Sequence, residues 1–236
     1  MTLVIQHVAE TGSTNADVAA LARAGAPEGR WIRADAQTGG RGRQGRPWVS
    51  PPGNFYGSTF VRRLQGDPPA SSLAFVAAVA LDALLQAWVG PDRLSIKWPN
   101  DLLVDGAKLS GILLEGADDA VVVGIGVNLA HHPIGLDRPT TSLAGLGLSP
   151  PSPADFAEEL ATSFAAWLAR WRGEGLPVIL ARWQARAHRI GTALRVQAPE
   201  GQLEGLFDGL TQEGALKLRC PDGHVHQVHA GDVFLL

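Results

Sequence analysis

The chain has 236 residues, 45% of them hydrophobic and 18% charged, which suits one medium-sized globular domain with a small appendage. Its formal net charge of −3 opposes nucleic-acid binding by bulk charge, although a local basic site is compatible with it. The lone cysteine excludes an internal disulfide and is typical of a reducing compartment, and the N-terminus lacks the features of a signal peptide. We therefore expect a cytoplasmic protein.

The first part of the chain predicts three strands and two helices. They are a strand at 3–8, a helix from Ser13 or Thr14 to about residue 24, strands at 31–34 and 55–61, and a helix from Ser71 or Ser72 to Val89. The last helix lies in the longest apolar run of the chain, but it carries Asp82 and Gln86. At helical spacing this pattern indicates a buried core helix, so we expect no association with a membrane.

The middle of the chain predicts an antiparallel meander and two helices. Its elements are a strand at 94–98, a hairpin of 102–104 and 109–115, a strand at 121–129, a surface loop at 131–149, and helices at 152–172 and 178–188. Beyond Gly191 the sequence predicts short strands at 194–197, 203–208, 215–219, 224–228 and 233–236, a pattern that favours a small β-barrel. The predicted fold is α+β, with domains at 1–188 and 189–236.

The stretch from Gly40 to Trp48 contains three arginines and three glycines, and no acidic residue occurs between Thr38 and Arg63. Glycine lets backbone N–H groups converge on an anion, and arginine supplies a rigid fork of donors that matches phosphate and carboxylate. The pattern predicts a cationic loop that closes over a phosphorylated ligand. A solvated basic loop or a nucleic-acid patch is the alternative.

Lysine is rare in this chain: only Lys97, Lys108 and Lys217 are lysines, and the other 17 basic residues are arginines. A retained lysine suggests that a compact ammonium is needed, although codon bias gives the same pattern. In the segment KWPND, Lys97 is predicted to contact phosphate and Asp101 to bind Mg²⁺, which prefers one or two carboxylates together with substrate phosphates. The alternative is a turn in which the Asn and Asp side chains satisfy their own backbone.

Glycines accompany the remaining signals. Lys108 precedes Gly111 on a predicted strand, and the next strand contains Gly124 and Gly126 and ends in Asn128. A glycine inside a strand often marks a close approach of backbone or ligand. Together with the cationic loop, these features indicate a nucleotide site that is neither a P-loop nor a Rossmann site. The histidines have no spacing typical of a metal site.

These motifs together resemble the biotin protein ligases, also called biotin–[acetyl-CoA-carboxylase] ligases. The resemblance rests on Ser13-Thr14-Asn15, Gln37, the GRGRQGRPW loop, KWPND at 97–101, KLSGIL at 108–113 and GIGVNL at 124–129, which follow the family's order and spacing. Residues 209–219 and 228–233 are similar to its small C-terminal domain. The resemblance implies a catalytic domain of the class II synthetase/biotin ligase type, with a mixed or antiparallel sheet and helices, and an SH3-like β-barrel.

The resemblance also implies a reaction and a set of residue roles. Biotin reacts with ATP to give biotinyl-5′-AMP, and a lysine of a biotin carboxyl carrier protein then takes the biotinyl group, with Mg²⁺ as the metal. The residues implied for biotin are Ser13, Thr14, Asn15, Gln37, Gly40, Arg41, Gly42, Arg43, Lys108 and Gly111. Those implied for the nucleotide are Arg43, Arg46, Trp48, Lys97, Asn100 and Asn128, with Asp101 on the metal and Lys108, Arg43 and Arg41 as catalytic residues.

The chain departs from the family pattern at both ends. Its first predicted strand begins near residue 3, so we expect a monofunctional ligase without the N-terminal DNA-binding domain, and it ends in Phe234-Leu235-Leu236 instead of Ser-Leu-Arg. In the C-terminal domain, Lys217 and Arg195 are the best candidates for site residues, and plain solvated strand residues are the alternative. A lipoate or octanoyl transferase relative and a biotin-responsive transcriptional regulator are the alternative functions, and the oligomeric state is open.

Overall fold

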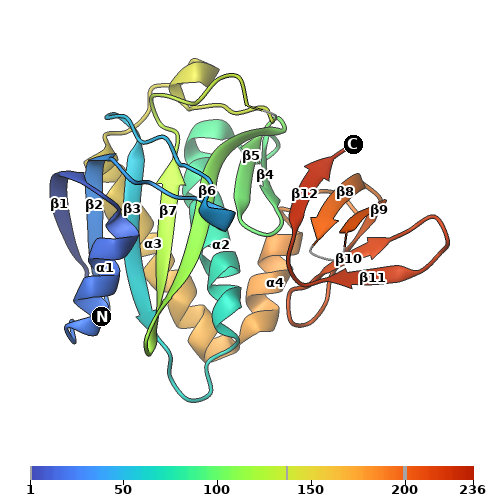
Figure 1. The fold of residues 1–236 in the computed structure, drawn as a ribbon, viewed down its shortest axis with the longest axis horizontal. Coiled ribbons are helices and arrows are strands. Elements are labelled where there is room, and N and C mark those ends of the chain that lie inside the picture. Colours follow the sequence, from blue (N-terminus) through green and yellow to red (C-terminus); the bar gives the residue numbers. More distant parts are fainter. Residues whose placement is uncertain (1, 137, 199–200) are drawn as a thin grey trace.

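The structure is a computed structural model, and it describes residues 2–136, 138–198 and 201–236. The fold contains one seven-stranded sheet and one five-stranded sheet. Figure 1 shows helices on both faces of the large sheet and the small sheet beside it. The large sheet consists of β1 (Val4–Thr11), β2 (Arg30–Gln37), β3 (Phe55–Arg62), β4 (Leu94–Lys97), β5 (Asp101–Val104), β6 (Ala107–Ala117) and β7 (Ala120–Val127). The helices are α1 (Thr14–Arg23), α2 (Leu73–Val89), α3 (Pro153–Glu174) and α4 (Leu176–Gln184). The small sheet consists of β8 (Ala193–Ala198), β9 (Gly201–Leu210), β10 (Leu216–Arg219), β11 (Val225–Val228) and β12 (Asp232–Leu235).

The large sheet has the order β1-β2-β3-β7-β6-β5-β4, and its neighbouring strands are antiparallel except for the parallel pair β1 and β2. Helices α2, α3 and α4 lie behind the sheet in Figure 1, and α1 lies in front of it. The small sheet has the order β11-β10-β9-β8-β12. The predicted α+β class with a small SH3-like barrel is confirmed.

Strand β7 shows how the two faces of the large sheet differ. Successive residues of a strand point to opposite faces. The odd-numbered residues from Val121 to Val127 belong to the main core with α2 and α3, whereas Val122 packs with residues of α1. Gly124 and Gly126 lie on the same face of the strand as Val122. This face, on the α1 side of the sheet, therefore carries no side chains at these two positions and leaves space for other parts of the chain.

Helix α2 is the core helix that the sequence predicts. Together with the turn before it, the segment Ala70–Val89 is long and apolar enough to cross a membrane, but most of it is buried inside the protein. The fully buried Asp82 is paired with Arg182 at 2.6 Å and Arg186 at 2.9 Å, both from the region of α4. A buried carboxylate is tolerated because these partners satisfy it, and the ion cluster ties α2 to α4.

Several element boundaries differ from the prediction. Strand β1 continues to Thr11 because its parallel pairing with β2 extends to the Thr11–Gln37 pair. Helix α4 spans Leu176–Gln184, so it begins and ends earlier than the predicted 178–188. His188 therefore lies in the connection between α4 and the barrel.

His188 is half-buried, and its buried Nε2 has no hydrogen-bond partner in the described part of the chain. Burial, together with the charge of Lys97, lowers the pKa of His188 from 6.5 to about 4. The unfolded chain therefore binds a proton near pH 6.5 that the folded protein takes up only near pH 4. The free energy of unfolding consequently falls as the pH drops through this window, by roughly 3 kcal/mol in full.

We expect His188→Leu to remove this part of the pH dependence. The free energy of unfolding of the variant and of the unmodified protein can be measured by urea unfolding at several pH values between 7 and 4.5. Carboxylates titrate in both proteins, so the difference between the two curves isolates the contribution of His188. The exposed histidine variant His226→Gln is the control and should keep the slope of the unmodified protein. Parallel stability curves for the His188→Leu variant and the unmodified protein would contradict the assigned pKa.

Candidate active site

A cavity of about 210 Å³ opens on the α1 side of the large sheet, between the Gly/Arg loop, β6, β7 and β12. Nearly all residues that the sequence singles out for a site come together on its wall. They are Ser13, Thr14, Asn15, Gln37, Arg41, Gly42, Arg43, Arg46, Trp48, Lys97, Asn100, Asp101, Lys108, Gly111 and Asn128. Residues from six separate segments thus meet at one site.

Gly40 is an exception, because it lies at the base of the loop and not on the cavity wall. A Cβ atom at this position would lie 2.5 Å from the carbonyl oxygen of Trp48 and 2.7 Å from the hydroxyl of Ser50. The Gly40 carbonyl also accepts a hydrogen bond from the Trp48 N–H at 2.9 Å. The glycine is needed for the loop to close on itself, so its predicted contact with biotin has no support in the geometry.

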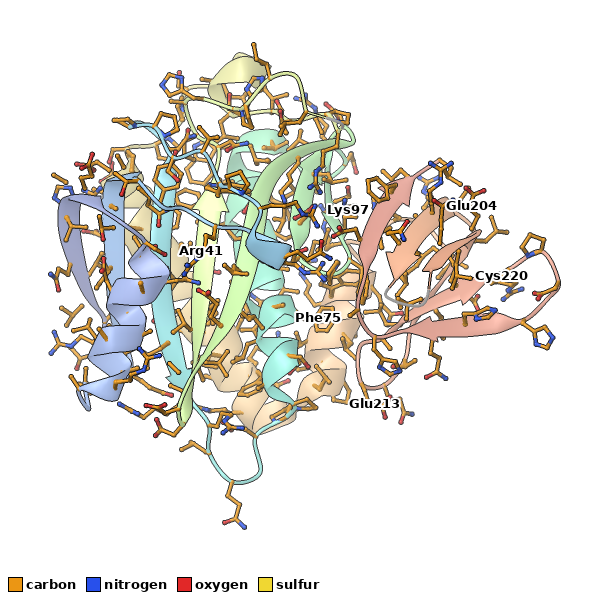
Figure 2. All side chains as sticks on the ribbon, in the orientation of Figure 1. Arg41, Phe75, Lys97, Glu204, Glu213 and Cys220 are labelled. Carbon is orange, nitrogen blue, oxygen red and sulfur yellow. The ribbon has the colours of Figure 1, made fainter. Side chains whose placement is uncertain are left out.

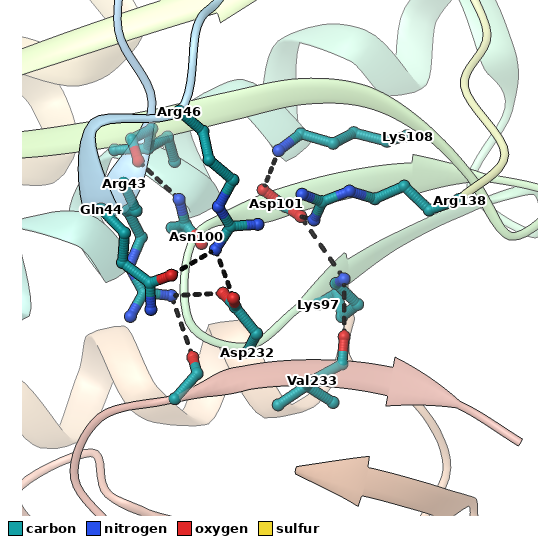
Figure 3. Close-up of polar contacts among 12 residues, drawn as sticks. Arg43, Gln44, Arg46, Lys97, Asn100, Asp101, Lys108, Arg138, Asp232 and Val233 are labelled. Atoms are coloured by element: carbon teal, nitrogen blue, oxygen red, sulfur yellow. Dashed lines mark hydrogen bonds and ion pairs between the residues drawn. The ribbon is translucent and has the colours of Figure 1, made fainter. Parts of the chain in front are cut away.

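Asp101 is the centre of a buried ion cluster (Figure 3). Its carboxylate lies 2.5 Å from the ammonium of Lys108, 3.4 Å from that of Lys97 and 3.9 Å from the guanidinium of Arg138. Burial alone would raise the pKa of Asp101, but Lys108 and Lys97 outweigh it and hold the pKa below its usual value. The carboxylate is therefore ionised and already surrounded by positive charge.

This arrangement does not fit the predicted Mg²⁺ ligand. A divalent cation on Asp101 would have to take the place of Lys108 and approach Lys97 and Arg138. Among the described residues, no group of three or more His, Cys, Asp and Glu side chains is placed to hold a metal ion. In the structure Asp101 is instead the counter-ion that keeps three cations at the cavity.

Lys108 is held from several sides. Its ammonium lies 5.3 Å from the centre of the Trp48 ring, and its backbone pairs with the segment 139–141 through two hydrogen bonds of 2.9 Å. Burial lowers the pKa of Lys108 against the opposing pull of Asp101. The backbone pairing also fixes Arg138, because that residue directly precedes Pro139.

Strand β12 of the barrel closes one side of the cavity. Arg43 donates to the carbonyl of Gly231 at 3.0 Å, Arg46 pairs with the carboxylate of Asp232, and Lys97 donates to the carbonyl of Val233 at 2.9 Å. Figure 3 shows these contacts joining the Gly/Arg loop and β4 to the barrel. The sequence motif that includes Gly231-Asp232-Val233 marked this segment, but it gave no role to Asp232.

The two barrel residues favoured by the sequence, Lys217 and Arg195, do not line the cavity. Arg195 instead forms an exposed ion pair with Glu204 at 2.7 Å. Figure 2 shows Glu204 on the barrel, apart from Arg41 and Lys97, which lie by the large sheet. The structure therefore gives neither residue a place at the cavity, and Arg195 matches the alternative of a solvated strand residue.

The strand glycines admit side chains of the protein itself. A Cβ at Gly126 would lie 2.6 Å from the Trp48 indole, and one at Gly111 would lie 3.0 Å from it. At Gly124 a Cβ would overlap the side-chain oxygen of Asn15. The sequence predicted that backbone or ligand comes close to these glycines. In the structure the side chains of Trp48 and Asn15 do so, and they cover the part of the sheet that has no side chains of its own.

Two predicted amide contacts are already used within the fold. The side chain of Asn100 donates to the carbonyl of Ile112 at 2.7 Å, and that of Asn128 donates to the carbonyl of Thr141 at 3.0 Å. Both amides therefore bind carbonyls of segments far along the chain, and the Asn100 contact is with β6 and not with its own turn, as the alternative interpretation of KWPND would require. Their predicted contacts with the nucleotide stay predictions.

The opposite end of the cavity is lined mainly by uncharged polar side chains. Thr14 and Gln37 are joined by hydrogen bonds of 2.9 and 3.1 Å, and the Thr14 hydroxyl lies 2.7 Å from that of Ser58. Ser58 donates to Asn15 at 2.6 Å, and Asn15 donates to Glu115 at 2.6 Å. Ser58 and Glu115 were not predicted, because nothing in the sequence shows that β3 and β6 bring them beside α1.

Comparisons with known proteins agree with this geometry. The family profile described as "Biotin/lipoate A/B protein ligase family" matches residues 11–129, and that described as "Biotin protein ligase C terminal domain" matches residues 190–236. A biotin–[acetyl-CoA-carboxylase] ligase of Paracoccus denitrificans is 41% identical over 96% of this chain and 98% of its own length, and one of Mycobacterium tuberculosis is 37% identical over 96% and 86%. The solved structure of a biotin protein ligase from Aquifex aeolicus in complex with biotin and ATP has the same fold, with a TM-score of 0.87, 22% identity, and coverage of 98% of this chain and 99% of that one. The chain belongs to the biotin/lipoate A/B protein ligase family.

Proposed function

We propose that this protein is an ATP-dependent biotin ligase, which activates biotin as biotinyl-5′-AMP and transfers the biotinyl group to a lysine of a biotin carboxyl carrier protein. One observation carries the proposal: a cationic end and a neutral polar end share one cavity. At the cationic end, five basic side chains face only two carboxylates, and they are Lys97, Lys108, Arg138, Arg43 and Arg46. The names of the relatives from Paracoccus and Mycobacterium support the same activity.

The two ends suit the two substrates. The ring of biotin carries a urea group whose N–H and C=O groups need matched hydrogen-bond partners, and the polar end around Thr14 and Gln37 supplies such partners. The triphosphate of ATP is a polyanion, and the surplus of cations around Asp101 provides its counter-charge. A substrate that spans the cavity then has its carboxylate and the α-phosphate between the two ends.

The first step joins two anions. An oxygen of the biotin carboxylate attacks the α-phosphorus of ATP, the bond from that phosphorus to the bridging oxygen breaks, and pyrophosphate leaves with that oxygen. Lys108 is placed to offset the repulsion between carboxylate and phosphate, because its ammonium is held at the cavity by Asp101 and Trp48. When bound to ATP, Mg²⁺ would supply further charge neutralisation at the phosphates.

The second step needs the adenylate to survive until the carrier arrives. The acceptor lysine amine attacks the biotinyl carbonyl, and AMP leaves with the oxygen that joined the two groups. Because an acyl adenylate hydrolyses readily, the Gly/Arg loop must keep water away from it. We propose that Arg41, Gly42 and Arg43 close over the intermediate, with Arg43 bound to the barrel at Gly231.

We expect Arg43→Ala to release biotinyl-5′-AMP. The substitution removes the hydrogen bond to Gly231 and the ion pair with Asp232 at 3.7 Å, so the loop loses its attachment to β12. The fraction of adenylate that remains bound after gel filtration should fall about tenfold, in line with the loss of a charge-assisted hydrogen bond. Arg23→Ala, which removes an exposed arginine, is the matched control. Equal retention by both variants would show that Arg43 does not secure the loop.

We further propose that residues 1–188 form the catalytic domain and residues 189–236 a barrel that completes the site through β12. The partner is the carrier protein of acetyl-CoA carboxylase or a related carboxylase, the reaction takes place in the cytoplasm, and neither DNA nor a membrane takes part. Biotin-dependent release of pyrophosphate from ATP tests the first step. Release that depends on lipoate and not on biotin would favour a lipoate ligase.

A further inference from the structure

We infer that Glu115 is a positioning residue, which sets the hydrogen-bond polarity of the biotin end of the cavity. The inference rests on the proposed function and concerns a residue outside the motifs of the sequence. Glu115 lies on β6, and one of its carboxylate oxygens accepts a hydrogen bond from the side-chain amide of Asn15 at 2.6 Å. The carboxylate itself does not line the cavity, whereas Asn15 does.

An ionised carboxylate can only accept hydrogen bonds, so Glu115 decides which end of the Asn15 amide faces it. The nitrogen of Asn15 must point to Glu115, and its oxygen then points to Ser58, whose hydroxyl lies 2.6 Å away. The two ends of a primary amide are nearly equal in size, so packing against Gly124 cannot select the orientation. The charge on Glu115 makes this selection.

The selection continues along the chain of hydrogen bonds. Because Ser58 gives its only proton to Asn15, it can only accept in its 2.7 Å contact with Thr14. The Thr14 hydroxyl therefore donates into the protein, either to Ser58 or to the Gln37 oxygen at 3.1 Å. Thr14 consequently offers the cavity a hydrogen-bond acceptor, which suits the N–H groups of a urea ring.

A simple ion pair with Arg41 does not account for Glu115. The nearest atoms of the two side chains are 3.6 Å apart, and the side chains are 52% and 37% exposed, so the pair contributes little. Figure 2 shows Arg41 by the α1 side of the large sheet, in the Gly/Arg loop. The shorter contact runs inward to Asn15, whose residue is only 6% exposed.

The first test uses Glu115→Gln, whose amide can donate as well as accept. Without an enforced orientation of Asn15, part of the hydrogen-bond chain reverses: Ser58 then donates to Thr14, and the Thr14 proton is left to the Gln37 oxygen at 3.1 Å or to the cavity, where it would face the urea N–H groups. The KM for biotin in the pyrophosphate-release assay should rise about tenfold, the size of one lost hydrogen bond, while the KM for ATP changes less than about twofold. The variant Glu159→Gln, an exposed glutamate on α3, is the matched control.

The second test exchanges the two groups. In the double variant Asn15→Asp with Glu115→Gln, the glutamine donates to the new carboxylate, which still accepts from Ser58 and so restores the original polarity. The double variant should therefore recover most of the biotin KM, whereas Asn15→Asp alone places two carboxylates in contact and should be the weakest binder. Recovery also separates positioning from a structural role, because the double variant has lost the Arg41 pair as Glu115→Gln has.

The outcomes distinguish the inference from the proposed function. An unmodified protein without biotin-dependent pyrophosphate release would overturn both. An active protein whose Glu115→Gln variant keeps the biotin KM, or whose double variant is no better than Asn15→Asp, would overturn only the role of Glu115. An equal rise in the KM values of biotin and ATP would also overturn it, since that result indicates a general disturbance of the site.

Discussion

Replacing Lys108 with arginine is expected to lower the rate of biotin-dependent pyrophosphate release by about 10²-fold, while the protein stays folded. The ammonium of Lys108 occupies a narrow space between the Trp48 ring and Asp101, and a Cβ at Gly111 would already lie 3.1 Å from it. A guanidinium keeps the charge, but it is planar and larger, so it cannot take the same position. The charge at the carboxylate–phosphate junction is then misplaced.

The matched control for this prediction is Lys217→Arg on β10, which changes a lysine outside the cavity. Thermal unfolding checks that both variants fold, and the rate of pyrophosphate release at saturating ATP and biotin compares them. If Lys108→Arg and Lys217→Arg were equally active, the assignment of Lys108 to the reacting groups would be wrong.

Replacing Asp101 with asparagine is expected to destabilise the free protein by about 3–5 kcal/mol, because three cations then lose their counter-ion in a buried site. A bound polyanion should offset this loss. Pyrophosphate or ATP should therefore raise the melting temperature of the variant more than that of the unmodified protein. The exposed variant Asp105→Asn, which loses only the pair with Arg93, is the control and should change stability little.

The same variant separates the two roles considered for Asp101. A metal ligand would give a protein of nearly unchanged stability whose only defect is a weaker response to Mg²⁺. A counter-ion gives a less stable protein that phosphate compounds restore. The geometry favours the second result, because Lys108 lies 2.5 Å from the carboxylate.

The sequence predicted the elements well, because period-2 and helical patterns are properties of neighbouring residues. The continuous apolar runs of β7 and α2 are visible in the chain itself. Boundaries that depend on a partner strand are not visible in this way, and β1 continues to Thr11 because it pairs with Gln37 of β2. The length of such a strand follows from pairing between distant segments.

The site was predictable where its residues stand in motifs, and not where tertiary contacts bring them in. Lys97 and Lys108 stand out in a chain that otherwise uses arginine. Ser58 and Glu115 lie on ordinary strands, and only the packing of α1 on the sheet brings Asn15 to them. The sequence also cannot distinguish a carboxylate that binds a metal from one that holds lysines, since the difference lies in distances.

We expect one cavity of this protein to activate biotin for transfer to a carrier lysine. The most direct measurement is mass spectrometry of an apo biotin carboxyl carrier domain after incubation with this protein, ATP, Mg²⁺ and biotin. We predict that the carrier gains the mass of one biotinyl group, and that the gain disappears without ATP or when the acceptor lysine is replaced. A carrier that stays unmodified with biotin, or that gains a lipoyl group when lipoate is supplied in its place, would contradict the account.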